Sequence, residues 1–174
     1  MLAANLYRVL GKKTNIENKD AKEDNVNFIN KNIKKSNKNS MSPEEEILNI
    51  DKSFSIETFL IGAKQAFYMI VSSYKKNNLE SVEKLLSPKV LKAFQEQIKV
   101  KGNIDALKIT NVKSSIINIE VVKKLAKIKV KFLSTQKNTL EKKDEIIDVV
   151  DIWTFEKIIG SKDPTWILAE VSSE

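Results

Sequence analysis

Four carboxylates between residues 144 and 151 are the side chains best suited by type and spacing for acid–base or metal chemistry. They are Asp144, Glu145, Asp148 and Asp151. Two neighbouring carboxylates can act as general acid and general base, or can share a cation. Asp148 and Asp151 are separated by an odd number of positions, so in a strand their side chains point to opposite faces. We therefore expect a solvated strand face that balances nearby lysines, with no catalytic pair.

The composition excludes several other kinds of chemistry. The 174-residue chain has no histidine and no cysteine, which removes Ser-His-Asp and Cys-His catalysis, His- or Cys-based zinc sites and disulfides. Its four glycines, Gly11, Gly62, Gly102 and Gly160, lie far apart, so no glycine-rich phosphate-binding loop is present. We expect no catalytic residue, no metal site and no cofactor.

Lysine carries almost all of the positive charge. The net charge is +7, and Arg8 is the single arginine. Five lysines gather in one predicted strand and the turn before it: Lys123, Lys124, Lys127, Lys129 and Lys131. This pattern indicates a basic outer face that attracts anions diffusely, because specific base or phosphate recognition favours the planar fork of arginine. No aromatic residue alternates with these lysines on their face, which disfavours stacking on single-stranded nucleic acid.

Aromatic and aliphatic residues indicate a core, a pocket and a membrane-contacting helix. A candidate apolar pocket between helices and sheet is formed by Phe59, Phe67, Phe94, Trp153, Phe155 and Trp166. Core packing alone also explains these aromatics, and both interpretations can hold together. A short amphipathic stripe made of Ile47, Leu48, Ile50 and Phe54, with Lys52, either docks on its own domain or lies in a membrane interface.

The elements that position these residues follow from periodicity. Ser42-Pro43 followed by three glutamates predicts a helix start, and a longer helix is predicted over 56–76. Two further helices are expected over 79–86 and 88–101. Strands are predicted at 115–122, with a lead-in at 108–111, then at 126–132, 145–155 and 166–171, with polar turns at 137–144 and 160–164. Helices followed by an antiparallel meander give an α+β fold.

The first 41 residues differ in composition from the rest. Residues 1–13 contain the apolar run Leu2–Leu10 followed by Gly11, Lys12 and Lys13. Nine residues rise only about 14 Å as a helix, which is too short to span a bilayer. We expect a membrane-proximal segment at 1–13, with Lys12 and Lys13 on the cytoplasmic side, a flexible linker at 14–41 and a folded domain at 42–174.

Three motifs in order resemble a known family. FLIGAKQAF (Phe59–Phe67), LLSPKVLKAF (Leu85–Phe94) and DIWTF with DPTW (Asp151–Trp166) together resemble the Tim44-like domain family of the mitochondrial import-motor scaffold and its alphaproteobacterial relatives. The resemblance covers 42–172. It implies helices packed on a four-stranded antiparallel sheet, cone-shaped with an apolar pocket, and membrane-contacting helices near the start of the domain.

The resemblance also implies a function. We expect a non-enzymatic scaffold or adaptor at a bacterial inner membrane, peripheral or N-terminally anchored, that binds anionic, cardiolipin-containing lipid and takes part in protein transport. A translocase or chaperone is the expected protein partner, and no specific nucleic acid is expected. Two alternatives stay open: an adaptor that contacts the ribosome or RNA through the lysine face, and a cone-shaped fold that binds a small ligand against Trp153 and Trp166.

Overall fold

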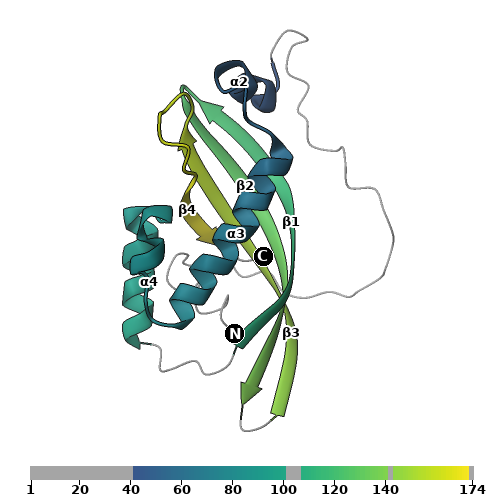
Figure 1. The fold of residues 1–174 in the computed structure, drawn as a ribbon, viewed down its shortest axis with the longest axis vertical. Helices are drawn as coiled ribbons and strands as arrows, with labels where there is room; N and C mark the ends of the chain where they lie inside the picture. The colour runs from purple at the N-terminus through teal and green to yellow at the C-terminus, as the bar shows by residue number, and fades with distance from the viewer. Residues whose placement is uncertain (1–40, 101–106, 141–142, 173–174) are drawn as a thin grey trace, which may run out of the picture.

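The computed structural model describes residues 41–100, 107–140 and 143–172, in which helices come first and strands follow (Figure 1). The helical segments are α2 (Pro43–Ile50), α3 (Ile56–Lys75), the 3-10 helix η1 (Glu80–Leu85) and α4 (Pro88–Val100). The strands are β1 (Leu107–Val122), β2 (Leu125–Leu140), β3 (Lys143–Ile158) and β4 (Ile167–Ser172). This order confirms the predicted α+β class.

The strands of the described residues form one antiparallel sheet in the order β1-β2-β3-β4. The β2–β3 pairing is long and regular, from Leu125 opposite Ile158 to Leu140 opposite Lys143. β4 is much shorter and pairs with β3 only from Ile152 to Glu156. Within the described ranges, the first half of β3 therefore has β2 as its only strand neighbour.

Local signals fix the starts and ends of the helices. Ser42 forms a capping box with Glu45: the Glu45 amide donates to Ser42 Oγ at 3.2 Å, and the Ser42 amide donates to Glu45 Oε2 at 2.7 Å. Ser87 caps α4 by accepting from the Val90 amide at 3.3 Å, and Pro88 follows it. Asn77 follows α3 with a φ of 56°, in the left-handed region that asparagine tolerates. These boundaries were predictable from sequence.

The core lies between α3 and the concave face of the sheet. Phe67 is fully buried and stacks on Phe132, with ring centroids 4.7 Å apart, and also contacts Trp153 at 4.8 Å. At the C-terminal end of α3, Tyr74 meets Phe94 of α4 edge to face at 5.3 Å. The rings thus connect both helices to the strands, as the aromatic spacing in the sequence indicated.

Two predicted elements differ from the structure. The strand predicted at 115–122 and its lead-in at 108–111 are one continuous strand, β1, which begins at Leu107. The expected polar turn at 137–144 is largely strand, because β2 and β3 extend their pairing to Leu140 and Lys143. The helix predicted over 79–86 is the 3-10 helix η1. Its end is held at the sheet, where Leu86 bridges Leu168 and the Ser87 amide donates to the Leu168 carbonyl oxygen at 2.9 Å.

Candidate functional site

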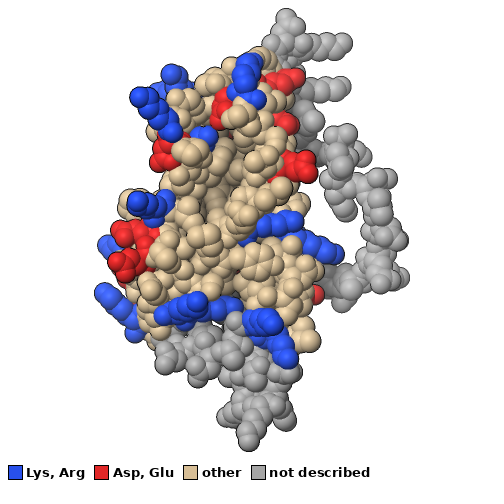
Figure 2. Space-filling view, viewed as in Figure 1, with Lys and Arg blue, Asp and Glu red and all other residues tan. Residues whose placement is uncertain are grey.

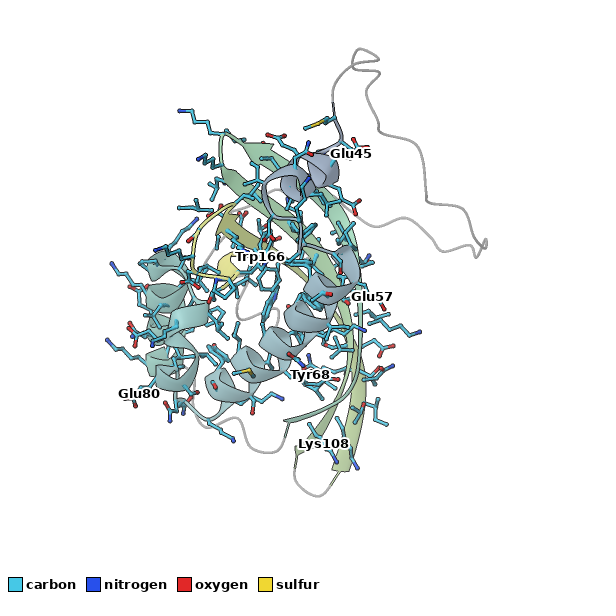
Figure 3. All side chains as sticks on the ribbon, turned by 45° about the horizontal axis from the view of Figure 1, so that its top comes forward. Glu45, Glu57, Tyr68, Glu80, Lys108 and Trp166 are labelled. Atoms are coloured by element: carbon cyan, nitrogen blue, oxygen red, sulfur yellow. The ribbon has the colours of Figure 1, made fainter. Side chains whose placement is uncertain are left out.

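A groove of about 380 Å³ opens between α3, the α2–α3 connection and the segment that leads into β4. Its aromatic lining comes from four rings: Phe54, Phe59, Phe155 and Trp166. Phe59 and Trp166 meet at 4.9 Å with an interplanar angle of 68°, and Phe54 lies 6.1 Å from Trp166. On the face that carries α3, a hollow lies in a surface of mainly uncharged residues (Figure 2). Trp166 lies beside α3 at the strand side (Figure 3).

Small residues of α3 keep the groove open. Gly62, Ala63 and Ala66 line its helical wall, and a Cβ added at Gly62 would have no heavy-atom neighbour within 4 Å. The space above Gly62 belongs to the groove. An apolar, concave surface with a few polar groups at its edge is the usual form of a small-molecule site.

One ion pair lies at the edge of the groove. Lys157 Nζ lies 3.3 Å from Asp51 Oδ2 and 6.0 Å from the centroid of the Trp166 ring. The Ser53 hydroxyl donates to Asp51 Oδ1 at 2.6 Å, and this hydrogen bond, more than the ion pair, holds the pKa of Asp51 below its ordinary value. Asp51 therefore stays charged at neutral pH, and the α2–α3 connection is tied to β3.

The structure places three of the six predicted pocket residues in the groove and the other three in the core. Phe59, Phe155 and Trp166 line the groove. The others, Phe67, Phe94 and Trp153, have exposed fractions of 0–1% and do not line it, because they fill the interior between the helices and the sheet. Phe54, which we predicted to contact the membrane, is a groove residue that packs on Phe59 and Trp166.

The residues of the predicted membrane-contacting stripe are partly buried and partly exposed in the structure. Ile47 is 1% exposed and belongs to the core, so in this conformation it cannot enter a bilayer. Leu48 is half-buried, whereas Ile50 is 45% exposed and Lys52 is exposed. Ile47 and Ile50 are three positions apart, yet α2 ends at Ile50, and this terminal residue turns toward Gly160 and solvent. Lys12 and Lys13 lie outside the described residues.

The prediction of a solvated carboxylate face is wrong for Asp151. It is only 5% exposed, because it shares the concave face of β3 with Trp153 and Phe155. This burial raises the pKa of Asp151 to about 7. Asp148 is on the opposite face, as predicted, and accepts from Thr135 Oγ1 at 2.8 Å. In the part of the chain that the structure describes, no three Asp or Glu side chains are grouped to hold a metal ion.

The lysine face of β2 carries both signs of charge. Lys127, Lys129 and Lys131 project from the convex face, but Lys127 Nζ is 2.8 Å from Glu156 Oε1. This contact is the main cause that raises the pKa of Lys127. Lys123 and Lys124 belong to the β1–β2 turn and not to the strand itself. A mixed face is a weaker attraction for a nucleic-acid backbone than an unpaired row of lysines.

Comparison with known proteins decides the family. The model of the Tim44-like domain matches residues 40–173, which is most of the chain and all of the described elements. The chain belongs to the Tim44-like domain family. This family is associated with membrane-bound scaffolds of protein translocation.

A bacterial relative supports this placement. The Tim44-like chain is 27% identical over 119 residues to the uncharacterized protein RP434 of Rickettsia prowazekii, an alignment that covers 68% of this chain. The chain thus spans about half (53%) of that relative's length. Among the helices that the structure describes in this Tim44-like domain, none has the length and apolar character needed to cross a membrane.

Proposed function

We propose that this Tim44-like domain is a non-enzymatic scaffold that docks on anionic lipid of a bacterial inner membrane through one end of its sheet. The observation that carries the proposal is a convergence of exposed lysines and exposed apolar side chains at that end. We call this surface the basic tip. It consists of Lys52, Lys123, Lys124 and Lys162 together with Ile50, Val122 and Ile158.

Contacts between distant segments assemble the basic tip. A Cβ at Gly160 would lie 3.2 Å from Ile50 Cγ2, which puts the end of α2 beside the β3–β4 turn. The Ile159 amide donates to the Lys124 carbonyl oxygen at 2.8 Å, which brings the β1–β2 turn to the same place. Figure 2 shows lysine side chains at this end of the molecule, with acidic side chains among them. Ile50, Val122 and Ile158 are 45%, 49% and 60% exposed.

Both components of the basic tip suit a lipid interface. Each lysine near an anionic surface contributes about 1 kcal/mol of attraction, and exposed aliphatic side chains add binding in proportion to the apolar area they insert. Four lysines without apolar insertion would give binding that salt abolishes, since screening removes attraction over about 8 Å at physiological ionic strength. With both components, binding should weaken as salt rises and yet persist.

Co-sedimentation with vesicles tests the proposal. The full chain is mixed with cardiolipin-containing vesicles and with neutral vesicles at low and moderate salt, and the pelleted fraction is measured. We expect binding to the anionic vesicles alone. Replacing Lys123 and Lys124 by Glu should reduce it, as should Ile50→Asp. The matched control replaces Lys89 and Lys92 of α4, which changes the net charge equally at another place. Equal losses for the two charge reversals would overturn the assignment of the basic tip.

We also propose, as a second function, that the groove holds the apolar part of a small ligand. The aromatic lining and the open space above Gly62 support it. Binding of an apolar fluorescent dye, measured by quenching of Trp166, tests it. A dye that leaves Trp166 unquenched at saturation would contradict it. A translocase or chaperone partner stays a prediction from the family.

A further inference from the structure

The outer side of α3 is an exposed helix face with few charges (Figure 2). Its exposed side chains recur at helical spacing and form one stripe, made of Ile61, Gln65, Tyr68, Met69 and Ser72. Ile61, Tyr68 and Met69 are 54%, 40% and 49% exposed. In the stretch 58–73 of this helix, the single charged residue is Lys64, which is half-buried. The exposed face of a helix in a soluble domain is normally charged or polar, so we read this outer stripe as an interaction surface.

The outer stripe is complementary to itself about Gln65. Successive residues of a helix are about 100° apart around its axis, which places Ile61 and Tyr68 on one flank of the stripe. Gly62 and Met69 lie on the other flank. On each flank, one residue precedes Gln65 and the other follows it at nearly the same distance along the chain. When two such helices pack antiparallel across Gln65, each residue therefore faces the other member of its own flank in the second copy.

The facing residues also match in size. A Cβ added at Gly62 would have no heavy-atom neighbour within 4 Å, so there is room above this residue. Met69 of a second copy, a flexible side chain, would fill that room. On the other flank, the aliphatic side chain of Ile61 would lie against the ring of Tyr68. At the centre, the amide of Gln65 both donates and accepts, so the two copies of this side chain can form reciprocal hydrogen bonds.

The charges at the two ends of α3 favour the antiparallel arrangement. Glu57 is in the first turn of the helix, Lys75 is in the last turn and Lys76 follows it. An antiparallel pair brings the acidic end of one helix to the basic end of the other, and it also brings together opposite ends of the helix dipoles. A parallel pair would place like charges side by side.

We propose that the outer stripe is the interface of a homodimer, in which two copies of this chain pack their α3 helices antiparallel around a two-fold axis at Gln65. Each contact then occurs twice, as in the isologous interfaces of most soluble dimers. A helix of 20 residues is about 30 Å long, and one pair of such helices buries less than the roughly 800 Å² per partner of a standard interface. We therefore expect a weak dimer that forms between micromolar and millimolar concentration.

The dimer goes beyond the proposed lipid docking and does not rest on it, because the basic tip contains no residue of α3. It uses one residue of the groove, Gly62. A ligand bound there would compete with Met69 of the second copy, yet neither the ligand nor the dimer requires the other.

Sedimentation equilibrium of the full chain, without lipid, tests the proposal. Runs from micromolar to millimolar concentration give the dissociation constant of the dimer. Met69→Glu puts a charge into the interface in each copy and should weaken the dimer by about tenfold or more. The matched control is Ile117→Glu on β1, because Ile117 is 48% exposed and lies outside α3, and it should leave the dissociation constant unchanged. A parent chain that stays monomeric at millimolar concentration, or equal losses for the two variants, would overturn the proposal.

A compensating pair of substitutions tests the antiparallel register. Gly62→Leu fills the room that Met69 of the second copy needs, and should weaken the dimer about tenfold. Adding Met69→Ala restores that room and should recover most of the loss, because facing residues are coupled. Far-UV circular dichroism checks that each variant is folded. If the double variant dimerises no better than Gly62→Leu alone, the two residues do not face each other and the register is wrong.

Vesicle binding separates the dimer from a lipid contact of the same stripe. Below the dissociation constant of the dimer, Met69→Glu should leave co-sedimentation with cardiolipin-containing vesicles unchanged, since the basic tip is intact. Reduced vesicle binding by Met69→Glu, together with a monomeric parent chain, would assign the outer stripe to lipid and overturn the dimer. A chain that dimerises but binds no vesicles would instead contradict the lipid-docking proposal and leave the dimer standing.

Discussion

Phe59 of α3 and Trp166 at the entrance to β4 meet edge to face, with ring centroids 4.9 Å apart. Their positions in the sequence are more than a hundred residues apart, and the contact closes one side of the groove. Phe59 also meets Phe155 edge to face at 5.8 Å, so one helical ring contacts both β3 and the segment that leads into β4. Such aromatic pairs add about 0.5–1.5 kcal/mol beyond the burial of their surface, so the groove has rigid walls.

Filling the groove should weaken ligand binding without unfolding the domain. Gly62→Leu places a branched side chain in the open space above α3, where even an added Cβ meets no atom within 4 Å. We expect binding of an apolar dye to fall severalfold while the urea midpoint stays near that of the parent chain. Gly62→Ala, which adds only a methyl group, is the matched control. Undiminished dye binding to the leucine variant would place the dye elsewhere.

Two Gly→Ala substitutions should change stability in opposite directions. Gly160 has a φ of +79°, and its Cβ would lie 3.2 Å from Ile50 Cγ2, so Gly160→Ala should cost about 1–2 kcal/mol. Gly62 is in a helix with free space, and Gly62→Ala should add roughly 0.5–1 kcal/mol. Urea unfolding of both variants measures the two changes. A stabilising Gly160→Ala would mean that the turn adapts without strain.

Removing the central ring should cost most of the stability of the domain. Phe67 is fully buried between Phe132 and Trp153, and Phe67→Ala should lower the free energy of unfolding by about 3–5 kcal/mol. Tyr68→Ala, at the next position and 40% exposed, should cost much less. Denaturant unfolding followed by far-UV circular dichroism compares them. Similar losses for both variants would contradict this placement of the core.

Asp151 should make the stability of the domain depend on pH. Burial raises the pKa of Asp151 in the folded state to about 7, above the value of about 3.9 in an unfolded chain. Between these values the folded state binds more protons than the unfolded state, so the free energy of unfolding falls as pH rises from 4 to 7. No charged side chain of the described residues contributes to this shift, which comes from burial.

The size of this pH effect has an upper limit set by the pKa difference. Three pKa units correspond to about 4 kcal/mol, lost by pH 7 and constant above it. Unfolding midpoints of the parent chain at pH 5 and pH 8, compared with those of Asp151→Asn, isolate the contribution of this carboxyl. If the two chains have parallel profiles, Asp151 does not titrate in this range.

The fold was predictable from sequence wherever the signal was local. Ser42-Pro43 and Ser87-Pro88 marked helix starts, Asn77 marked a helix end, and the alternation of apolar residues with lysine marked β2. The continuity of β1 and the extra length of β2 were missed because Ser114, Ser134 and Gln136 place polar groups on the buried face. Period-two alternation of hydrophobicity cannot detect a strand whose inward positions are polar.

The candidate site was predictable only in part. Phe59, Phe155 and Trp166 line the groove. Nothing in the sequence separated them from Phe67 and Trp153, because aromatic character does not reveal which rings border open space. Asp151 could have been found. It is two positions before Trp153 and four before Phe155, and in a strand this spacing places all three side chains on one face.

The short β4 divides β3 into two stretches whose backbone amides should exchange with solvent at different rates. From Ile152 to Glu156 the backbone lies between two strands, whereas within the described residues the stretch up to Asp151 is paired on the β2 side alone. In that first stretch, every second amide points away from β2. These amides should exchange with deuterated solvent faster than their immediate neighbours, because local fluctuations suffice to expose them. We therefore expect amide protection that alternates along the first half of β3 and becomes uniform beyond it. This pattern would indicate that the sheet opens from the end at which β3 begins.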